Sequence, residues 1–98
     1  MTQQKVYRTV EVSANEIVWV SPTIYLSKEN VMFAVNAKAE SFTKYFDYEV
    51  KPYEGHKWDS VCLNECGKDN WVSVEKCFTA TNEKGYKKVI GFITYEAV

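Results

Sequence analysis

Residues 28–46, KENVMFAVNAKAESFTKYF, decide the fold of this chain. With a helical period they form a helix that Ser27 would cap. Its buried stripe would be Met32, Val35, Ala39, Phe42 and Phe46. With a period of two, residues 31–37 alternate as a strand instead. Periodicity alone does not choose between the two for a short apolar run, so the strand is preferred here and the helix is kept as the alternative.

Short strands are predicted on both sides of this stretch. Residues 5–13 alternate, with Val6, Val10 and Val12 on one face. Residues 17–20 form a short apolar strand, and 23–26 a further short β-like run. Residues 42–51 predict a half-buried strand that Pro52 ends, because proline cannot donate to a sheet ladder.

The C-terminal third predicts a hairpin. Residues 71–81 alternate, 82–85 supply a turn that ends in glycine, and 86–95 return as a second strand. Apolar residues on both faces place this last strand centrally in the sheet. The predicted fold is therefore all-β, a small sandwich or barrel of about six or seven short strands, and it becomes α+β if residues 28–46 are helical. The predicted core includes Val18, Phe46, Val74, Phe78 and Ile90.

Length, charge and cysteine content limit what the protein can be. Ninety-eight residues make a single β-rich domain, 1–98. Twelve basic and thirteen acidic residues, interspersed along the chain, lack the basic excess typical of duplex-DNA binders. No apolar run approaches the ~18 residues of a membrane span, and the polar start MTQQK lacks the apolar region of a signal peptide. Three cysteines, an odd number, argue against a disulfide framework, so we expect a cytoplasmic protein with reduced thiols.

One histidine and three cysteines have the composition of a closed tetrahedral zinc site: His56, Cys62, Cys66 and Cys77. The middle cysteine pair has knuckle-like spacing, but the chain has no C-x₂-C pair and Cys77 falls within a predicted strand. A Cys–His nucleophile would also need an orienting group and an oxyanion hole, and the sequence indicates neither. We therefore expect no enzyme and no cofactor, and a zinc-stabilised domain stays an alternative.

Aromatic residues interleaved with lysines form the strongest candidate for a binding surface. The candidate partner-binding residues are Tyr45, Tyr53, Lys57, Trp58 and Trp71. Tryptophan and tyrosine dominate protein–protein hot spots, and the same residues stack on bases in proteins that bind single-stranded nucleic acid. Equally, they could cap the edges of a small core, since apolar surface is normal in folded proteins.

Small size, many aromatics and the lack of a catalytic motif are typical of inhibitor, adaptor and immunity proteins, including those of phages. We expect a non-enzymatic module that binds and occludes a protein partner, with no membrane association. The alternative is a single-stranded nucleic-acid-binding barrel of the OB type. The sequence does not indicate the identity of the partner or the oligomeric state.

Overall fold

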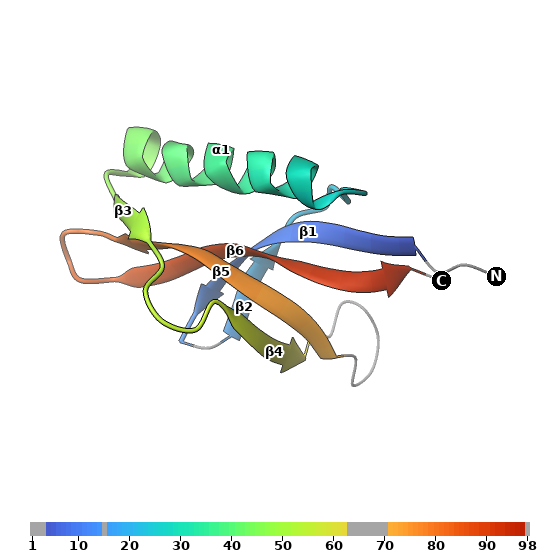
Figure 1. Ribbon diagram of the computed structural model, residues 1–98. Helices are drawn as coiled ribbons and strands as arrows, with labels where there is room; N and C mark the ends of the chain where they lie inside the picture. Colours follow the sequence, from blue (N-terminus) through green and yellow to red (C-terminus); the bar gives the residue numbers. More distant parts are fainter. Residues whose placement is uncertain (1–3, 15, 63–70, 98) are drawn as a thin grey trace.

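An antiparallel sheet of six strands carries one helix across one of its faces (Figure 1). The structure, a computed structural model, describes residues 4–14, 16–62 and 71–97. Its elements are β1 (Gln4–Ser13), β2 (Glu16–Val20), α1 (Lys28–Phe46), β3 (Glu49–Pro52), β4 (Trp58–Cys62), β5 (Trp71–Thr81) and β6 (Lys87–Ala97). The strand order is β2-β1-β6-β5-β3, and β4 pairs with the opposite end of β5 from β3.

The predicted β-rich fold is confirmed, in its α+β form, because residues 28–46 are helical. The predicted C-terminal hairpin is present as β5 and β6. Strand β6 lies between β1 and β5, so its central position is also as predicted. In the part of the chain that the structure describes, β2 pairs with neither β3 nor β4, and the sheet stays open.

The strand preferred for residues 31–37 is wrong, since the whole segment lies in α1. The strand predicted over 42–51 is wrong in its first half, because α1 continues to Phe46 and β3 begins only at Glu49. The buried residues of α1 follow the helical period: Val31, Val35, Ala39 and Phe42. A strand would bury Phe33 beside Val31, whereas its side chain is 79% exposed.

Both ends of α1 are capped. The Ser27 hydroxyl accepts the backbone N–H of Asn30 at 3.2 Å, as predicted for an N-cap. At the other end Asp47 adopts the left-handed conformation (φ 56°), and the N–H of Tyr48 donates to the Phe42 carbonyl at 3.1 Å. This closing turn directs the chain back into β3.

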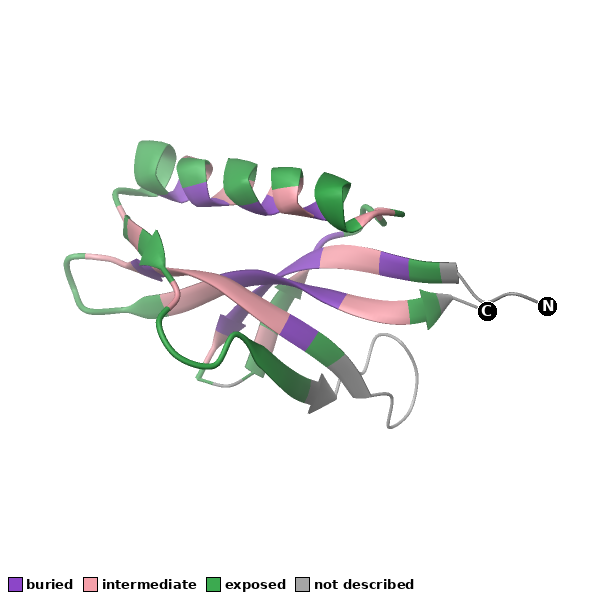
Figure 2. Ribbon diagram, viewed as in Figure 1, coloured by how far each residue is buried: buried purple, intermediate pink, exposed green. Residues whose placement is uncertain are grey.

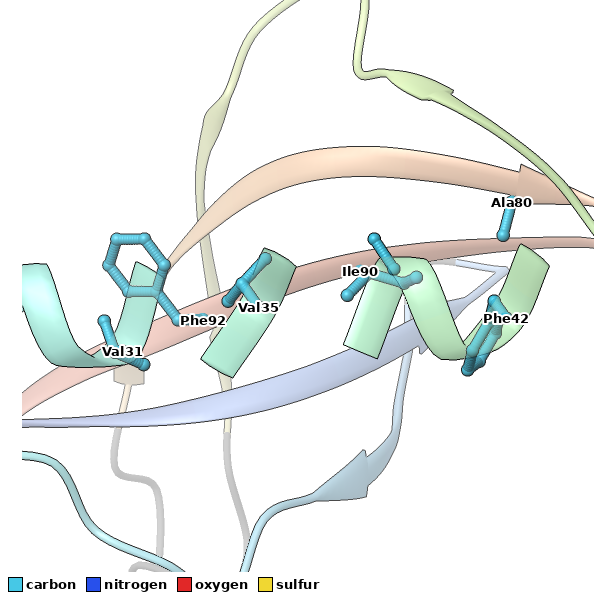
Figure 3. Close-up of a cluster of buried hydrophobic side chains, with 7 residues drawn as sticks. Val31, Val35, Phe42, Ala80, Ile90 and Phe92 are labelled. Atoms are coloured by element: carbon cyan, nitrogen blue, oxygen red, sulfur yellow. The ribbon is translucent and has the colours of Figure 1, made fainter. Parts of the chain in front are cut away.

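Two apolar clusters lie on opposite faces of the sheet, because side chains alternate along each strand. The helix-side cluster packs α1 on the three residues Ala80, Ile90 and Phe92 (Figure 3). The cluster on the far face consists of Val10, Val12, Val74 and Ile93. Burial therefore concentrates in the middle of the long strands and on the sheet-facing side of α1 (Figure 2).

The predicted core is confirmed for Val74 and Ile90, while Phe78 is half-buried against the helix-side cluster. It is wrong for Val18 and Phe46, which are 52% and 61% exposed. Val18 is the extra residue of a β-bulge on the edge strand β2, so its side chain does not join the regular alternation. Phe46 ends α1, and its ring packs edge-on against Phe42 instead of entering the sheet.

A second β-bulge lies at Cys77 in β5. Lys76 pairs with Gly91 and Phe78 with Ile90, so Cys77 has no partner in β6. The chains approach so closely here that a Cβ on Gly91 would overlap the carbonyl of Glu75.

Candidate functional site

A buried carboxylate shared by two lysines lies between α1 and the sheet. Glu11 of β1 is 8% exposed. Its Oε2 lies 2.9 Å from the Nζ of Lys38 on α1, and its Oε1 lies 3.1 Å from the Nζ of Lys88 on β6. A carboxylate out of water is stable only when it is paired and hydrogen-bonded, and these two lysines satisfy that requirement.

The sequence positions all three groups. Glu11 alternates with the buried Val10 and Val12, so it points to the helix side of β1. Lys88 lies two residues before Ile90 and therefore shares the helix-side face of β6. Lys38 follows Val35 by one turn and lies on the sheet-facing side of α1.

The pKa values of Glu11 and Lys88 reflect this arrangement. Burial raises the pKa of the Glu11 carboxyl, but the hydrogen bonds and charges of Lys38 and Lys88 outweigh burial and hold it below the ordinary value of 4.5. Burial lowers the pKa of Lys88, yet its contact with Glu11 dominates and raises it above 10.5. Glu11 is therefore ionised and Lys88 protonated at neutral pH.

Aromatic rings surround the charges. Trp19 pairs directly with Glu11 across β1 and β2, and the Nζ of Lys38 lies 3.6 Å from the centroid of its ring. The Phe42 ring lies 5.7 Å from the Nζ of both lysines. Phe42 in turn contacts Phe46 and Tyr48, with ring centroids 5.9 and 5.1 Å apart.

The carboxylate, the two lysines and three of the rings border a hollow of about 250 Å³, called here the Glu11 pocket. It is lined by Glu11, Lys38, Phe42, Phe46, Tyr48 and Lys88. Two ammonium groups face one carboxylate, so the pocket holds one excess positive charge between aromatic walls. Such a site suits an anionic group that carries an apolar neighbour.

A larger groove of about 610 Å³ lies on the far face of the sheet. Strand register forms its floor, because Lys51, Thr79, Val89 and Val12 follow one another across β3, β5, β6 and β1. Lys76 and Lys87 also line the groove.

Acidic groups offset most of the positive charge in this groove. Lys51 pairs with Glu49 at 3.0 Å, and Lys76 pairs with Asp59 at 3.6 Å. Glu54 adds a further carboxylate to the lining. The groove is therefore close to neutral, unlike the Glu11 pocket.

Tyr53, Lys57 and Trp58, three of the predicted partner-binding residues, lie along β5. Tyr53 is half-buried under the Nζ of Lys76, 5.4 Å from its ring centroid, and the Lys57 carbonyl accepts the Lys76 N–H at 2.6 Å. Trp58 is 50% exposed, and its ring stands edge-on to Phe92 at 6.1 Å.

The other two predicted partner-binding residues lie elsewhere. Tyr45 lies near the end of α1 and is 68% exposed, with the Nζ of Lys44 5.4 Å from its ring centroid. Among the described residues no ring contact or hydrogen bond joins Tyr45 to Tyr53 or Trp58. Trp71 pairs with Cys62 through the backbone, and its side chain lies outside what the structure describes.

Two of the four predicted zinc ligands have described side chains. His56 is exposed between β3 and β4. Cys77 is half-buried, with its Sγ 4.0 Å from the Met32 sulfur; burial and the neighbouring Glu75 raise the pKa of its thiol to about 12. The Cys62 side chain and all of Cys66 lie outside the described residues. Within the described ranges no three His, Cys, Asp or Glu side chains are grouped to hold a metal.

The sequence interpretation missed the Glu11 pocket. One signal for it is present in the sequence: Glu11 lies between Val10 and Val12 in β1, and both faces of this strand are buried. A helix over residues 28–46 would have indicated the ion pair, because Lys38 then lies on the buried stripe between Val35 and Phe42.

The chain matches no family model, no curated protein and no solved structure. None of the helices that the structure describes has the length and apolar character needed to cross a membrane. Fold and site together define a β-rich α+β domain with a charged, aromatic pocket between helix and sheet.

Proposed function

We propose that this chain is a non-enzymatic protein-binding module, which acts by covering a surface of a protein partner as an inhibitor or adaptor does. The observation that carries the proposal is a set of exposed aromatic residues at and near the Glu11 pocket: Trp19, Tyr45 and Phe46, called here the helix-end patch, which are 37%, 68% and 61% exposed. Phe46 lines the pocket, Trp19 lies against Lys38 of its lining, and Tyr45 precedes Phe46 on α1.

The patch has the composition of an interaction hot spot. A continuous chain of contacts runs from Trp19 through Lys38 and Phe42 to Phe46, and Tyr45 lies in the same helical turn as Phe46. Monomeric proteins rarely expose large contiguous apolar patches without a use, and aromatic residues beside charged groups dominate binding energies. Partner binding by the surface of Tyr53, Lys57, Trp58 and Trp71 stays a prediction, and the same capture experiment tests it.

Partner capture with matched variants tests the proposal. The immobilised chain, incubated with extract of its native host, should retain a specific partner as wild type and as Phe33→Ala. Phe33 is as exposed as the patch residues but lies about 20 Å from Phe46 along the helix axis. Tyr45→Ala and Phe46→Ala should release that partner while remaining folded.

Two results would overturn this assignment. Loss of capture in Trp58→Ala but not in Phe46→Ala would move the site to the surface of Tyr53, Lys57, Trp58 and Trp71. Equal capture by all variants would remove both surfaces.

The second candidate function is the binding of single-stranded nucleic acid in the groove on the far face. The observation that favours it is Tyr53 beside Lys76, with Lys51 and Lys87 in the same groove. It ranks second because carboxylates offset those lysines. Fluorescence anisotropy with an oligothymidylate should show binding that weakens steeply as salt rises; an inert titration at low salt removes this candidate.

A further inference from the structure

We propose that the Glu11 pocket binds the carboxylate of an aspartate or glutamate side chain that the protein partner presents beside an apolar residue. This inference rests on the proposed function and names the chemistry of the partner. Its support comes from charge, unused donors, pocket size and the position of the pocket on α1.

The charge balance leaves room for one more anion. Glu11 is the single carboxylate among the residues that line the pocket, against the ammonium groups of Lys38 and Lys88. Both lysine side chains are largely buried, 20% and 25% exposed, so the excess charge is poorly screened by water. A second carboxylate would restore neutrality.

Hydrogen-bond donors are also left over. A lysine ammonium carries three N–H donors. In the described part of the chain, Lys38 and Lys88 each contact one oxygen atom, both of Glu11. Donors therefore remain on both lysines for a charge-assisted bond to an incoming carboxylate.

The size and walls of the pocket select a single side chain. A hollow of about 250 Å³ is smaller than the ~300–1,000 Å³ of sites that hold drug-sized ligands or cofactors. Phe42, Phe46 and Tyr48 offer ring surface to the methylene stem of an acidic side chain and to its apolar neighbour.

The position on α1 favours a carboxylate over a phosphate. Phe42 and Phe46 lie in the last turns of the helix, where the helix dipole presents partial negative charge. The pocket offers neither an arginine nor a helix N-terminus, the groups that usually hold phosphate. One excess positive charge at the negative end of a helix suits a monoanion better than a dianion.

Three short peptides test the proposal without the partner. Acetyl-Phe-Glu-amide carries a side-chain carboxylate, acetyl-Phe-Gln-amide is its neutral isostere, and acetyl-Phe-Gln with a free C-terminus carries only a terminal carboxylate. The readout is the ¹H–¹⁵N signal of the Trp19 indole, which lies against Lys38, compared with that of Trp58. We expect the glutamate peptide to shift Trp19 selectively and to bind about tenfold more tightly than the isostere.

Variants separate charge from fold. Lys88→Gln keeps a donor for Glu11 but removes the excess charge, and it should abolish the preference for the glutamate peptide. Lys44→Gln, an exposed position on the same helix and outside the pocket lining, should retain it.

Several outcomes would overturn the carboxylate site: equal binding of the glutamate and glutamine peptides, no shift at ~10 mM peptide, or an unchanged preference in Lys88→Gln. Tighter binding of acetyl-Phe-Gln with a free C-terminus than of acetyl-Phe-Glu-amide would show that the pocket prefers a terminal carboxylate to a side-chain carboxylate. Self-association abolished by Lys88→Gln would make the occupant a second copy. Partner capture lost in Phe46→Ala would still support the proposed function in each case, so the two can fail separately.

Discussion

The Glu11 carboxylate of β1 lies 2.9 Å from the Lys38 ammonium of α1, across the interface between helix and sheet. This ion pair joins the two layers of the fold at the middle of α1, where Lys38 also lies against the Trp19 ring. It therefore fixes α1 on the sheet and, together with Lys88, leaves one positive charge in excess in the Glu11 pocket. Both residues of this pair also line the pocket to which the proposed function is assigned.

Glu11→Gln should destabilise the protein by about 1.5–3 kcal/mol, because two partly buried ammonium groups lose their shared counter-charge. Urea unfolding followed by tryptophan fluorescence measures the change. Glu40→Gln, at an exposed position on α1, is the matched control and should stay within about 0.5 kcal/mol of wild type. Equal effects at the two positions would mean that the cluster contributes nothing to stability.

Acidification should weaken the fold through the same carboxyl group. Burial raises the pKa of Glu11, but its two lysines hold the net value below 4.5, so in the folded state the group takes up its proton at a lower pH than in the unfolded state. Its contribution to stability is thus full above about pH 4.5 and is lost as pH falls through the folded pKa. The urea midpoint of wild type should drop in that range more than that of Glu11→Gln; parallel curves would contradict the pKa assignment.

Phe92→Ala should cost about 3–5 kcal/mol, because Phe92 is fully buried between α1 and the sheet and contacts the rings of Tyr7 and Trp58. Phe33→Ala removes the same ring from a position that is 79% exposed and should change stability by less than about 0.5 kcal/mol. Thermal melting of the two variants checks the placement of the helix. A large loss at Phe33 would mean that another face of α1 packs on the sheet.

Cys77 should react slowly with thiol reagents in the folded protein. Its pKa of about 12, raised by burial and by Glu75, leaves very little thiolate at about pH 8. In a variant with Cys62→Ser and Cys66→Ser, labelling should be about a hundredfold slower or more in native buffer than in urea. Equal rates would show that the thiol is neither buried nor electrostatically protected.

Much of the fold was predictable from the sequence, and the failures have physical causes. The C-terminal hairpin and the central place of β6 follow from alternation and turn chemistry, which are local. Residues 31–37 fit both periods, and tertiary packing of Val31 and Val35 on the sheet decides for the helix. The exposure of Val18 depends on a bulge in pairing with β1, which no local pattern specifies.

The candidate site was less predictable. Tyr45, Tyr53 and Trp58 are predicted as binding residues because they are aromatics interleaved with lysines, a pattern that does not tell which of them lie together in the fold. The charge cluster joins residues of β1, α1 and β6 that are far apart in the chain, so no motif spacing marks it. Glu11 lies on the strand face opposite Val10 and Val12, and burial of that face follows only once residues 28–46 are identified as a helix.

The most direct test of the central claim is the dissociation constant of the captured partner, measured by calorimetry for wild type, Phe46→Ala and Phe33→Ala. Burial of an exposed hot-spot ring predicts that Phe46→Ala weakens binding by about tenfold or more, whereas Phe33→Ala binds like wild type. All three proteins should melt alike. Identical dissociation constants for wild type and Phe46→Ala would contradict the claim that the helix-end patch is the binding surface.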